Sequence, residues 1–195
     1  PNSVELRETT RPSVRAGYVL IETYFTSISA GTELLVLSGT LPALARGILR
    51  YPLVPGYEHV GRIVALGDGV RGVEEGTWVC CEGAPRFRDF GSCWGGHAEY
   101  VLAPAAEVLS LPRHMAPQHG LFIPLASIAL HGMQRARMAL GESVVVLGQG
   151  VVGLLALQLA RLAGASQVIA VDCLPGRLEM ARKLGATETV LADMA

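Results

Sequence analysis

One short glycine-rich stretch, GQGVVG from Gly148 to Gly153, constrains the fold of this chain more than any other feature. It stands between a β-branched run, Ser143 to Leu147, and a strongly apolar segment, Val151 to Ala163, which Gly164 closes. In such a turn the first glycine permits the tight bend and the third lets helix and strand pack closely. The stretch therefore predicts a strand, a glycine turn and a helix.

The segments that follow continue the same alternation. Gln167 to Val171 is a predicted strand, and Thr187 to Leu191 is another. Between them, Pro175 to Leu184 is a predicted amphipathic helix with proline near its start and Gly185 past its end. Strand, helix, strand, helix, strand is the βαβαβ unit of a doubly wound parallel sheet.

The glycine turn is a candidate phosphate-binding site, because the following helix offers free N–H groups and a partial positive charge to an anion. Asp172 follows about 20 residues later, at the end of the next strand, where an acid accepts hydrogen bonds from ribose hydroxyls. A carboxylate there would repel a 2′-phosphate, which favours NAD(H) over NADP(H), although Arg177 would weaken that preference if it folds back. A glycine turn without a ligand is the alternative. The predicted cofactor-binding residues are Gly148, Gly150, Val151, Val152, Gly153, Asp172 and Arg177.

Residues up to about 112 have a different pattern, with short runs rich in Val, Ile, Thr and Tyr separated by glycine turns. These runs are typical of a barrel or sandwich. After Pro112 the pattern becomes helical, with a helix over Pro117 to Arg137 that Pro124 must interrupt. We therefore expect two domains, residues 1–115 and 116–195. The predicted strands of the first are Tyr18–Ser27, Gly61–Leu66, Thr77–Cys81 and His97–Leu102.

Composition narrows the function classes. Half of the residues are hydrophobic, 17% are charged and the net charge is -1, so nothing indicates a nucleic-acid partner. Glycines break the most apolar run, Val144 to Ala160, which is also short for a membrane span. The four cysteines show no C-x2-C spacing and favour a reduced, cytoplasmic protein: Cys80, Cys81, Cys93 and Cys173.

Five segments carry a family resemblance, and they stand in the family's order: SISAGTELLVLSG, VPGYEHVGRIVALGDGV, GGHAEYVLAP, IPLASIALHGMQRA and VVVLGQGVVGLLALQLARLAGA. Nearly the whole chain resembles the medium-chain dehydrogenase/reductase superfamily, the fold of zinc alcohol dehydrogenases. The resemblance implies an α/β protein with a GroES-like barrel followed by a Rossmann domain, and an active site in the cleft between them. SISAGTE and YPLVPGYE most resemble the bacteriochlorophyllide-dehydrogenase-like branch.

The family's metal ligands are not retained. Its cysteine falls on Ala30, its histidine on Tyr57 and its third ligand on or near Ile123, while only Glu58 keeps its type. Zinc needs three or four N, S or O donors. The structural zinc lobe also lacks its closely spaced cysteines, so we expect no zinc at either place. An alternative metal site could use Cys80, Cys81, Cys93 and His97 as ligands. The spacing of these residues matches no common metal-binding pattern.

Without a metal, side chains must polarise the substrate oxygen and move a proton. Thr32 matches the family's proton-relaying hydroxyl, but the histidine that continues the relay falls on Leu35. Tyr57 holds its proton at neutral pH and could donate it to a developing alkoxide, or it could merely fill the volume of the missing zinc. His59 is a second candidate acid, and Glu58 is expected to orient its neighbours.

These observations predict a zinc-independent oxidoreductase that transfers a hydride between NAD(H) and a secondary alcohol or ketone of a bacterial metabolite, a small-molecule substrate. An enoyl or quinone reductase and a non-catalytic dinucleotide-binding protein are the alternatives. The resemblance also implies that only the first half of the nucleotide-binding domain is present, because family members are longer. A homodimer, the substrate and the direction of the reaction are left open.

Overall fold

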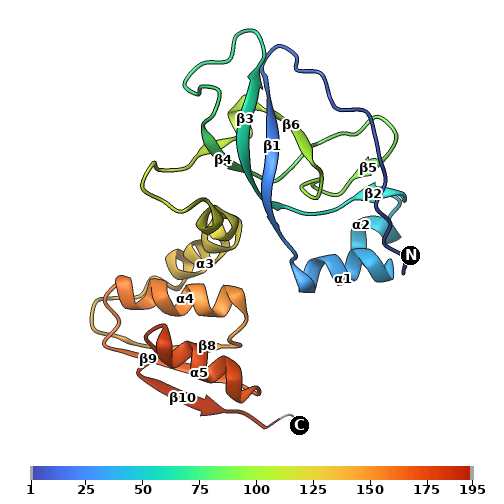
Figure 1. Cartoon of the computed structure of the whole chain (residues 1–195). Coiled ribbons are helices and arrows are strands. Elements are labelled where there is room, and N and C mark those ends of the chain that lie inside the picture. The colour runs from blue at the N-terminus through green and yellow to red at the C-terminus, as the bar shows by residue number, and fades with distance from the viewer. Residues whose placement is uncertain (1, 194–195) are drawn as a thin grey trace. The chain divides into compact units, whose positions relative to one another are not determined.

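The computed structural model describes residues 2–193, whose elements are labelled in Figure 1. The chain divides into two compact units between Ile123 and Pro124. This division lies later than the expected boundary at residue 115. The 3-10 helix η2 (Pro117–Phe122) accounts for the difference, because Leu121 at its end packs against the buried Val60 of the first unit.

The first unit is built on antiparallel strands. Five of them form a sheet in the order β6-β1-β3-β4-β7, and two short strands, β2 and β5, pair in parallel beside it. The four predicted strands all exist, with ends that differ by a few residues. The strands are β1 (Tyr18–Ser27), β2 (Leu53–Val54), β3 (Glu58–Leu66), β4 (Trp78–Cys81), β5 (Gly91–Ser92), β6 (Tyr100–Pro104) and β7 (Leu109–Ser110).

The prediction that the last long strand begins at His97 is wrong, because β6 begins at Tyr100. The backbone before it pairs elsewhere. The N–H of His97 donates to the carbonyl oxygen of Pro55 at 3.0 Å, and the N–H of Gly96 donates to that of Gly56 at 2.7 Å. These two bonds hold the segment against the residues that lead into β3.

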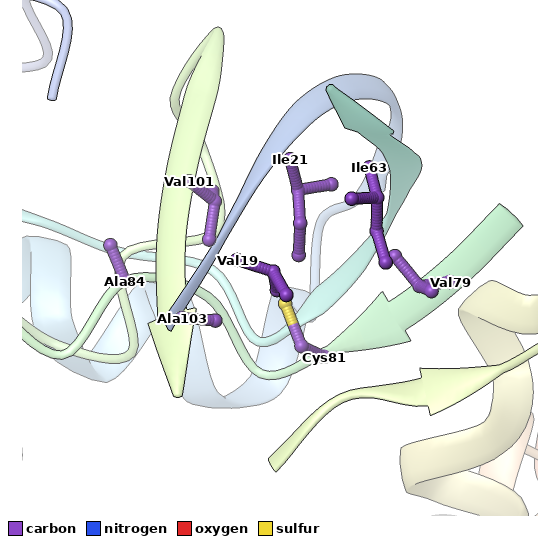
Figure 2. Close-up of a cluster of buried hydrophobic side chains, with 8 residues drawn as sticks. All are labelled: Val19, Ile21, Ile63, Val79, Cys81, Ala84, Val101 and Ala103. Atoms are coloured by element: carbon purple, nitrogen blue, oxygen red, sulfur yellow. The ribbon is translucent and has the colours of Figure 1, made fainter. Parts of the chain in front are cut away.

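Alternate residues of four strands form the main core of the first unit, which Figure 2 shows. Because side chains alternate across a strand, β1, β4 and β6 each contribute two residues that are two positions apart, and β3 contributes Ile63. Full burial of each Val or Ile side chain stabilises the fold by roughly 1.5–3 kcal/mol. The cluster comprises Val19, Ile21, Ile63, Val79, Cys81, Ala84, Val101 and Ala103.

Two helices of the first unit were not predicted from the sequence. They are α1 (Ala30–Ser38) and α2 (Pro42–Ala45). In α1 the apolar residues do not mark one buried face, because Leu34 is 60% exposed and Leu35 is 43% exposed. The helical periodicity that would reveal an amphipathic helix is therefore weak there.

The second unit is the predicted βαβαβ arrangement. Its three strands are parallel in the order β10-β9-β8. Helices α4 and α5 cover the same face of β9, because Leu157 and Leu178 both belong to the cluster formed by Val168 and Ala170. No helix within residues 2–193 is long and apolar enough to cross a membrane. The elements are α3 (Ile123–Ala136), β8 (Ser143–Leu147), α4 (Val151–Leu162), β9 (Gln167–Asp172), α5 (Pro175–Lys183) and β10 (Glu188–Leu191).

Candidate functional site

The glycine turn of the second unit has the geometry of an open cradle. Gly148 has φ 84°, in the left-handed region, and the backbone turns sharply from β8 into α4. A Cβ added at Gly148 or Gly150 would meet no atom within 4 Å, so space lies in front of both residues. A Cβ at Gly153 would lie 1.8 Å from the carbonyl oxygen of Gly148, so only glycine fits there. The N-terminus of α4, with Val151 and Val152, faces this turn with free N–H groups.

Asp172 is the last residue of β9 and lies next to the turn. Its carboxylate accepts hydrogen bonds from the backbone N–H groups of Gln149 at 2.6 Å and Leu174 at 2.9 Å. These two bonds lower the pKa of Asp172 below its usual value. Arg177 folds back toward it, with Nη1 3.6 Å from Oδ2. The structure therefore brings the turn, the acid and the arginine together.

Gln149 is a residue of the turn that sequence reasoning did not single out. Its side chain is only 1% exposed, and its Nε2 donates to the carbonyl oxygen of Val146 at 2.7 Å. This bond ties the turn to the end of β8. Within residues 2–193 its Oε1 has no hydrogen-bond partner, although buried oxygens of this kind are normally paired.

A second site lies in the first unit, where the segments before α1 and β3 meet. The hydroxyl of Tyr57 and the Oγ of Ser29 share a hydrogen bond of 2.5 Å, in which either oxygen could be the donor. The ring of Tyr57 packs edge-on against Trp94, with ring centroids 5.1 Å apart. Tyr57 is half-buried, so solvent reaches part of this side chain.

A glutamate of α1 connects this hydroxyl pair to a histidine. Glu33 accepts the backbone N–H of Ser29 at 3.0 Å through Oε1. Its Oε2 lies 2.9 Å from Nε2 of His97. Ser29 and Glu33 were missed as site residues from the sequence, and His97 was considered only as a metal ligand, because the contacts to His97 and Tyr57 join residues that are far apart in the chain.

Two other predicted residues lie near the hydroxyl pair in the chain. Thr32 is half-buried in the first turn of α1, on the same helix face as the N-cap residue Ser29. Glu58 directly follows Tyr57 and is 3% exposed. Its Oε1 has no hydrogen-bond partner among the residues that the structure describes. A buried carboxylate oxygen without a partner is costly unless water or a ligand supplies a donor.

His59 has a different environment from Tyr57. It is 1% exposed, and its Nε2 lies 2.9 Å from Oγ1 of Thr23, whose hydroxyl donates to the carbonyl oxygen of Ala98 at 2.5 Å. Nε2 is therefore the protonated nitrogen, and Nδ1 accepts from the thiol of Cys81 at 3.3 Å. Burial, helped by the charge of His97, lowers the pKa of His59 to about 4, and burial raises the pKa of Cys81 to about 12. A neutral histidine with both ring nitrogens hydrogen-bonded is better suited to packing than to proton transfer.

The residues present do not fit the zinc of the family. Ala30 directly follows Ser29, whose hydroxyl meets Tyr57, so two of the former ligand positions still lie close together. A methyl group offers no donor, the phenol is already hydrogen-bonded, and Ile123 packs against the cluster around Val60. Across residues 2–193, no group of three or more His, Cys, Asp or Glu side chains is placed to hold a metal ion.

The alternative cysteine site is not assembled either. Cys80 and Cys81 are neighbours in β4 and point to opposite faces. Cys80 belongs to the cluster of Val60 and Leu111, whereas Cys81 belongs to the main core. All four cysteines are free thiols.

Comparisons with known proteins agree with this architecture. Residues 15–113 match the family model of the alcohol dehydrogenase GroES-like domain, and residues 151–195 match that of the zinc-binding dehydrogenases. The uncharacterised zinc-type alcohol dehydrogenase-like protein YphC of Escherichia coli K12 is 33% identical over 96% of this chain and 60% of its own length. Galactitol 1-phosphate 5-dehydrogenase of the same strain is 31% identical over 71% of this chain and 45% of its own.

A solved structure gives the same result. A protein of Sinorhizobium meliloti 1021 assigned to the zinc-binding dehydrogenases, in complex with NADP, superposes with a TM-score of 0.83. It is 29% identical, and the match covers 97% of this chain and 59% of that protein. The chain thus spans about 60% of the length of such relatives. The predicted GroES-like and Rossmann folds are confirmed, and the chain belongs to the zinc-type alcohol dehydrogenase-like proteins of the medium-chain dehydrogenase/reductase superfamily.

Proposed function

We propose that this chain is the part of an oxidoreductase that moves a hydride between NAD(H) and a secondary alcohol or ketone without zinc. The observation that carries the proposal is the hydroxyl pair of Tyr57 and Ser29 where the family has metal ligands. A proton donor at that place can do what the metal does elsewhere, because both stabilise negative charge on the substrate oxygen.

The turn of the second unit would hold the cofactor. Its pyrophosphate would lie in the space before Gly148 and Gly150, facing the N–H groups of Val151, Val152 and Gly153. Asp172 would accept hydrogen bonds from the ribose, since each carboxylate oxygen can accept more than the one backbone bond it now has. The two N–H groups that already bond the carboxylate keep it charged, which favours NAD(H) over a cofactor with a 2′-phosphate.

Tyr57 would be the proton donor in the direction of reduction. When bound, NADH would supply the hydride for reduction of the carbonyl carbon. The hydroxyl of Tyr57 gives its proton to the carbonyl oxygen, and the phenolate that remains is reprotonated from solvent, which reaches this half-buried side chain. Thr32 on the same helix face as Ser29 would hold the substrate oxygen, and Glu58 would orient these groups.

Kinetics of Tyr57→Phe test the proposal. NADH oxidation is followed with a panel of ketones, and NADH affinity is measured by fluorescence. Loss of a general acid should lower kcat by about 100-fold while NADH affinity stays unchanged. Tyr24→Phe is a matched control, because Tyr24 is 49% exposed and packs on Trp78. Full activity of Tyr57→Phe would reject Tyr57 as the donor, and NADH binding without turnover of any carbonyl would favour a non-catalytic protein.

The position of Arg177 supports one alternative, an enoyl or quinone reductase that uses NADPH. Its guanidinium lies close enough to Asp172 to meet a 2′-phosphate. An enone panel assayed beside the ketones, each with NADH and NADPH, separates the two reactions.

The free thiols of the chain fit our prediction of a reducing compartment such as the cytoplasm.

A further inference from the structure

We propose that Ser29, Glu33 and His97 form a closed frame that positions the hydroxyl of Tyr57 for proton transfer. The inference deepens the proposed function, because it names the residues that hold its proton donor. All three residues act through hydrogen bonds and contacts within the first unit, and none of them has to bind a metal.

The frame begins at the hydroxyl pair. Ser29 Oγ lies 2.5 Å from the hydroxyl of Tyr57, and a serine hydroxyl can donate and accept. When Tyr57 gives up its proton, the hydroxyl of Ser29 can donate a hydrogen bond to the phenolate oxygen. Hydrogen bonds to a charged oxygen are about twice as strong as neutral ones, so this bond strengthens as the proton leaves.

The second side of the frame fixes Ser29. Glu33 Oε1 accepts the backbone N–H of Ser29 at 3.0 Å, one of the N–H groups that the start of a helix leaves without a partner. The same carboxylate reaches His97 through its other oxygen at 2.9 Å. The side chains of Glu33 and His97 are 12% and 22% exposed, so the pair is largely shielded from water.

The third side returns to Tyr57. Gly56, the residue before it, has φ 96° and lies under the ring of His97, because a Cβ at Gly56 would meet that ring at 2.8 Å. The backbone of His97 also donates to the carbonyl oxygen of Pro55 at 3.0 Å. His97 therefore contacts both segments that supply the hydroxyl pair. Its ring nitrogen bonds Glu33 in the segment of Ser29, and its ring face and backbone contact Gly56 and Pro55 in the segment of Tyr57.

The closed frame has a consequence for catalysis. The two hydroxyls come from segments 28 residues apart, so nothing in the local chain keeps them at hydrogen-bond distance. A shift of about 1 Å in a reacting group can cost about 100-fold in rate. Weakening the Glu33–His97 pair should therefore change the position of Tyr57 even though neither residue contacts it through a side-chain hydrogen bond.

A spectroscopic experiment tests the frame without requiring turnover. The protein is labelled with 3-fluorotyrosine at its 5 tyrosines, and the Tyr57 signal in the ¹⁹F spectrum is assigned by its loss in Tyr57→Phe. Ser29→Ala and Glu33→Gln should each shift or broaden the Tyr57 signal and leave the other four in place. Ser38→Ala, on the same helix at an exposed position, should change none. An unchanged Tyr57 signal in Glu33→Gln would overturn the proposal.

Kinetics provide the second arm. Ser29→Ala should lower kcat about tenfold with little change in KM, and Ser29→Thr, which keeps the hydroxyl, should restore it. The double variant Ser29→Ala/Tyr57→Phe should be no slower than Tyr57→Phe, because the hydroxyls act as a unit. Additive losses would contradict the frame. If Tyr57→Phe is fully active, the proposed donor fails, and the fluorine spectra alone then decide whether the frame holds Tyr57.

Discussion

The two units of this chain differ in the kind of site that each assembles. In the second unit Asp172 bonds the backbone of the glycine turn and lies 3.6 Å from Arg177. In the first unit, Ala30 and Tyr57 stand where the family has zinc ligands, and their segments still come together. The site in the second unit is therefore made of backbone groups and a carboxylate, whereas the site in the first unit is made of side-chain hydroxyls.

Steric constraint explains this difference. In the second unit the backbone itself needs Gly153, because any side chain there would run into the carbonyl oxygen of Gly148. In the first unit the site is made of side chains, and the hydroxyl of Tyr57 has the hydroxyl of Ser29 as its partner. A site made of backbone tolerates less substitution than a site made of side chains.

The largest effect is expected for Gly153→Ala. The added Cβ would lie 1.8 Å from a backbone oxygen, and neither partner can move without displacing α4 from β8. We expect a loss of at least about 3 kcal/mol in the free energy of unfolding and about 100-fold in NADH affinity. Urea unfolding and fluorescence titration measure the two quantities.

The matched control for that substitution is Gly176→Ala. Gly176 lies in α5, where an added Cβ would meet nothing within 4 Å, so this change should leave NADH binding intact and stabilise the helix slightly. Normal NADH affinity in Gly153→Ala would show that the second unit is no more constrained than the first.

An acid titration should distinguish the units next. His59 has a pKa of about 4 in the folded first unit and 6.5 as the ordinary value. Between these values the unfolded chain therefore binds more protons than the folded chain. The stabilisation that comes from keeping His59 neutral is fully present above pH 6.5. It should fall by up to about 3 kcal/mol as the pH drops from 6.5 to 4. Asp172, with its lowered pKa, gives the second unit no loss in that range.

Urea unfolding from pH 7 to pH 4 measures this dependence. His59→Gln should remove most of the slope, because glutamine does not titrate. His114→Gln, at an exposed position, should keep it. An equal slope in both variants would place the acid sensitivity elsewhere in the chain.

The smallest effect concerns cofactor choice. Asp172→Ser removes the carboxylate that repels a 2′-phosphate, so the preference for NADH over NADPH should fall about tenfold. Arg177→Ala should move the preference the other way. Titration of both cofactors measures the ratio, with Glu179→Gln, an exposed change on α5, as the charge-matched control. An unaltered ratio in Asp172→Ser would remove this residue from the ribose site.

The sequence predicted the second unit well, because its rules are local. Strand β8 has the predicted bounds, and α4 and α5 each end one residue before the predicted position. Proline and glycine mark the ends of α5, and the turn motif determines where β8 passes into α4. Helix η2 also follows the prediction in part, since the regular α-helix begins only at Ile123, next to the expected interruption at Pro124.

The first site was harder to predict, because it depends on contacts between distant residues. Tyr57 was singled out from the resemblance, but its partner Ser29 precedes a helix in which Leu34 and Leu35 are exposed and the helical pattern is weak. His97 was considered only as a metal ligand, whereas its contacts are to Glu33 and Gly56. His59 was considered as a second candidate acid, and its burial could not be inferred from a strand pattern alone.

Zinc analysis combined with NADH titration is the most direct test of a metal-free site in this chain. The protein is equilibrated with excess zinc, freed of unbound metal and measured by mass spectrometry of the elements, while NADH binding is titrated in the same sample. We expect full NADH binding with far less than stoichiometric zinc, since Ala30, Tyr57 and Ile123 offer no ligand set. Stoichiometric zinc that is lost in Glu58→Gln or Tyr57→Phe would contradict it.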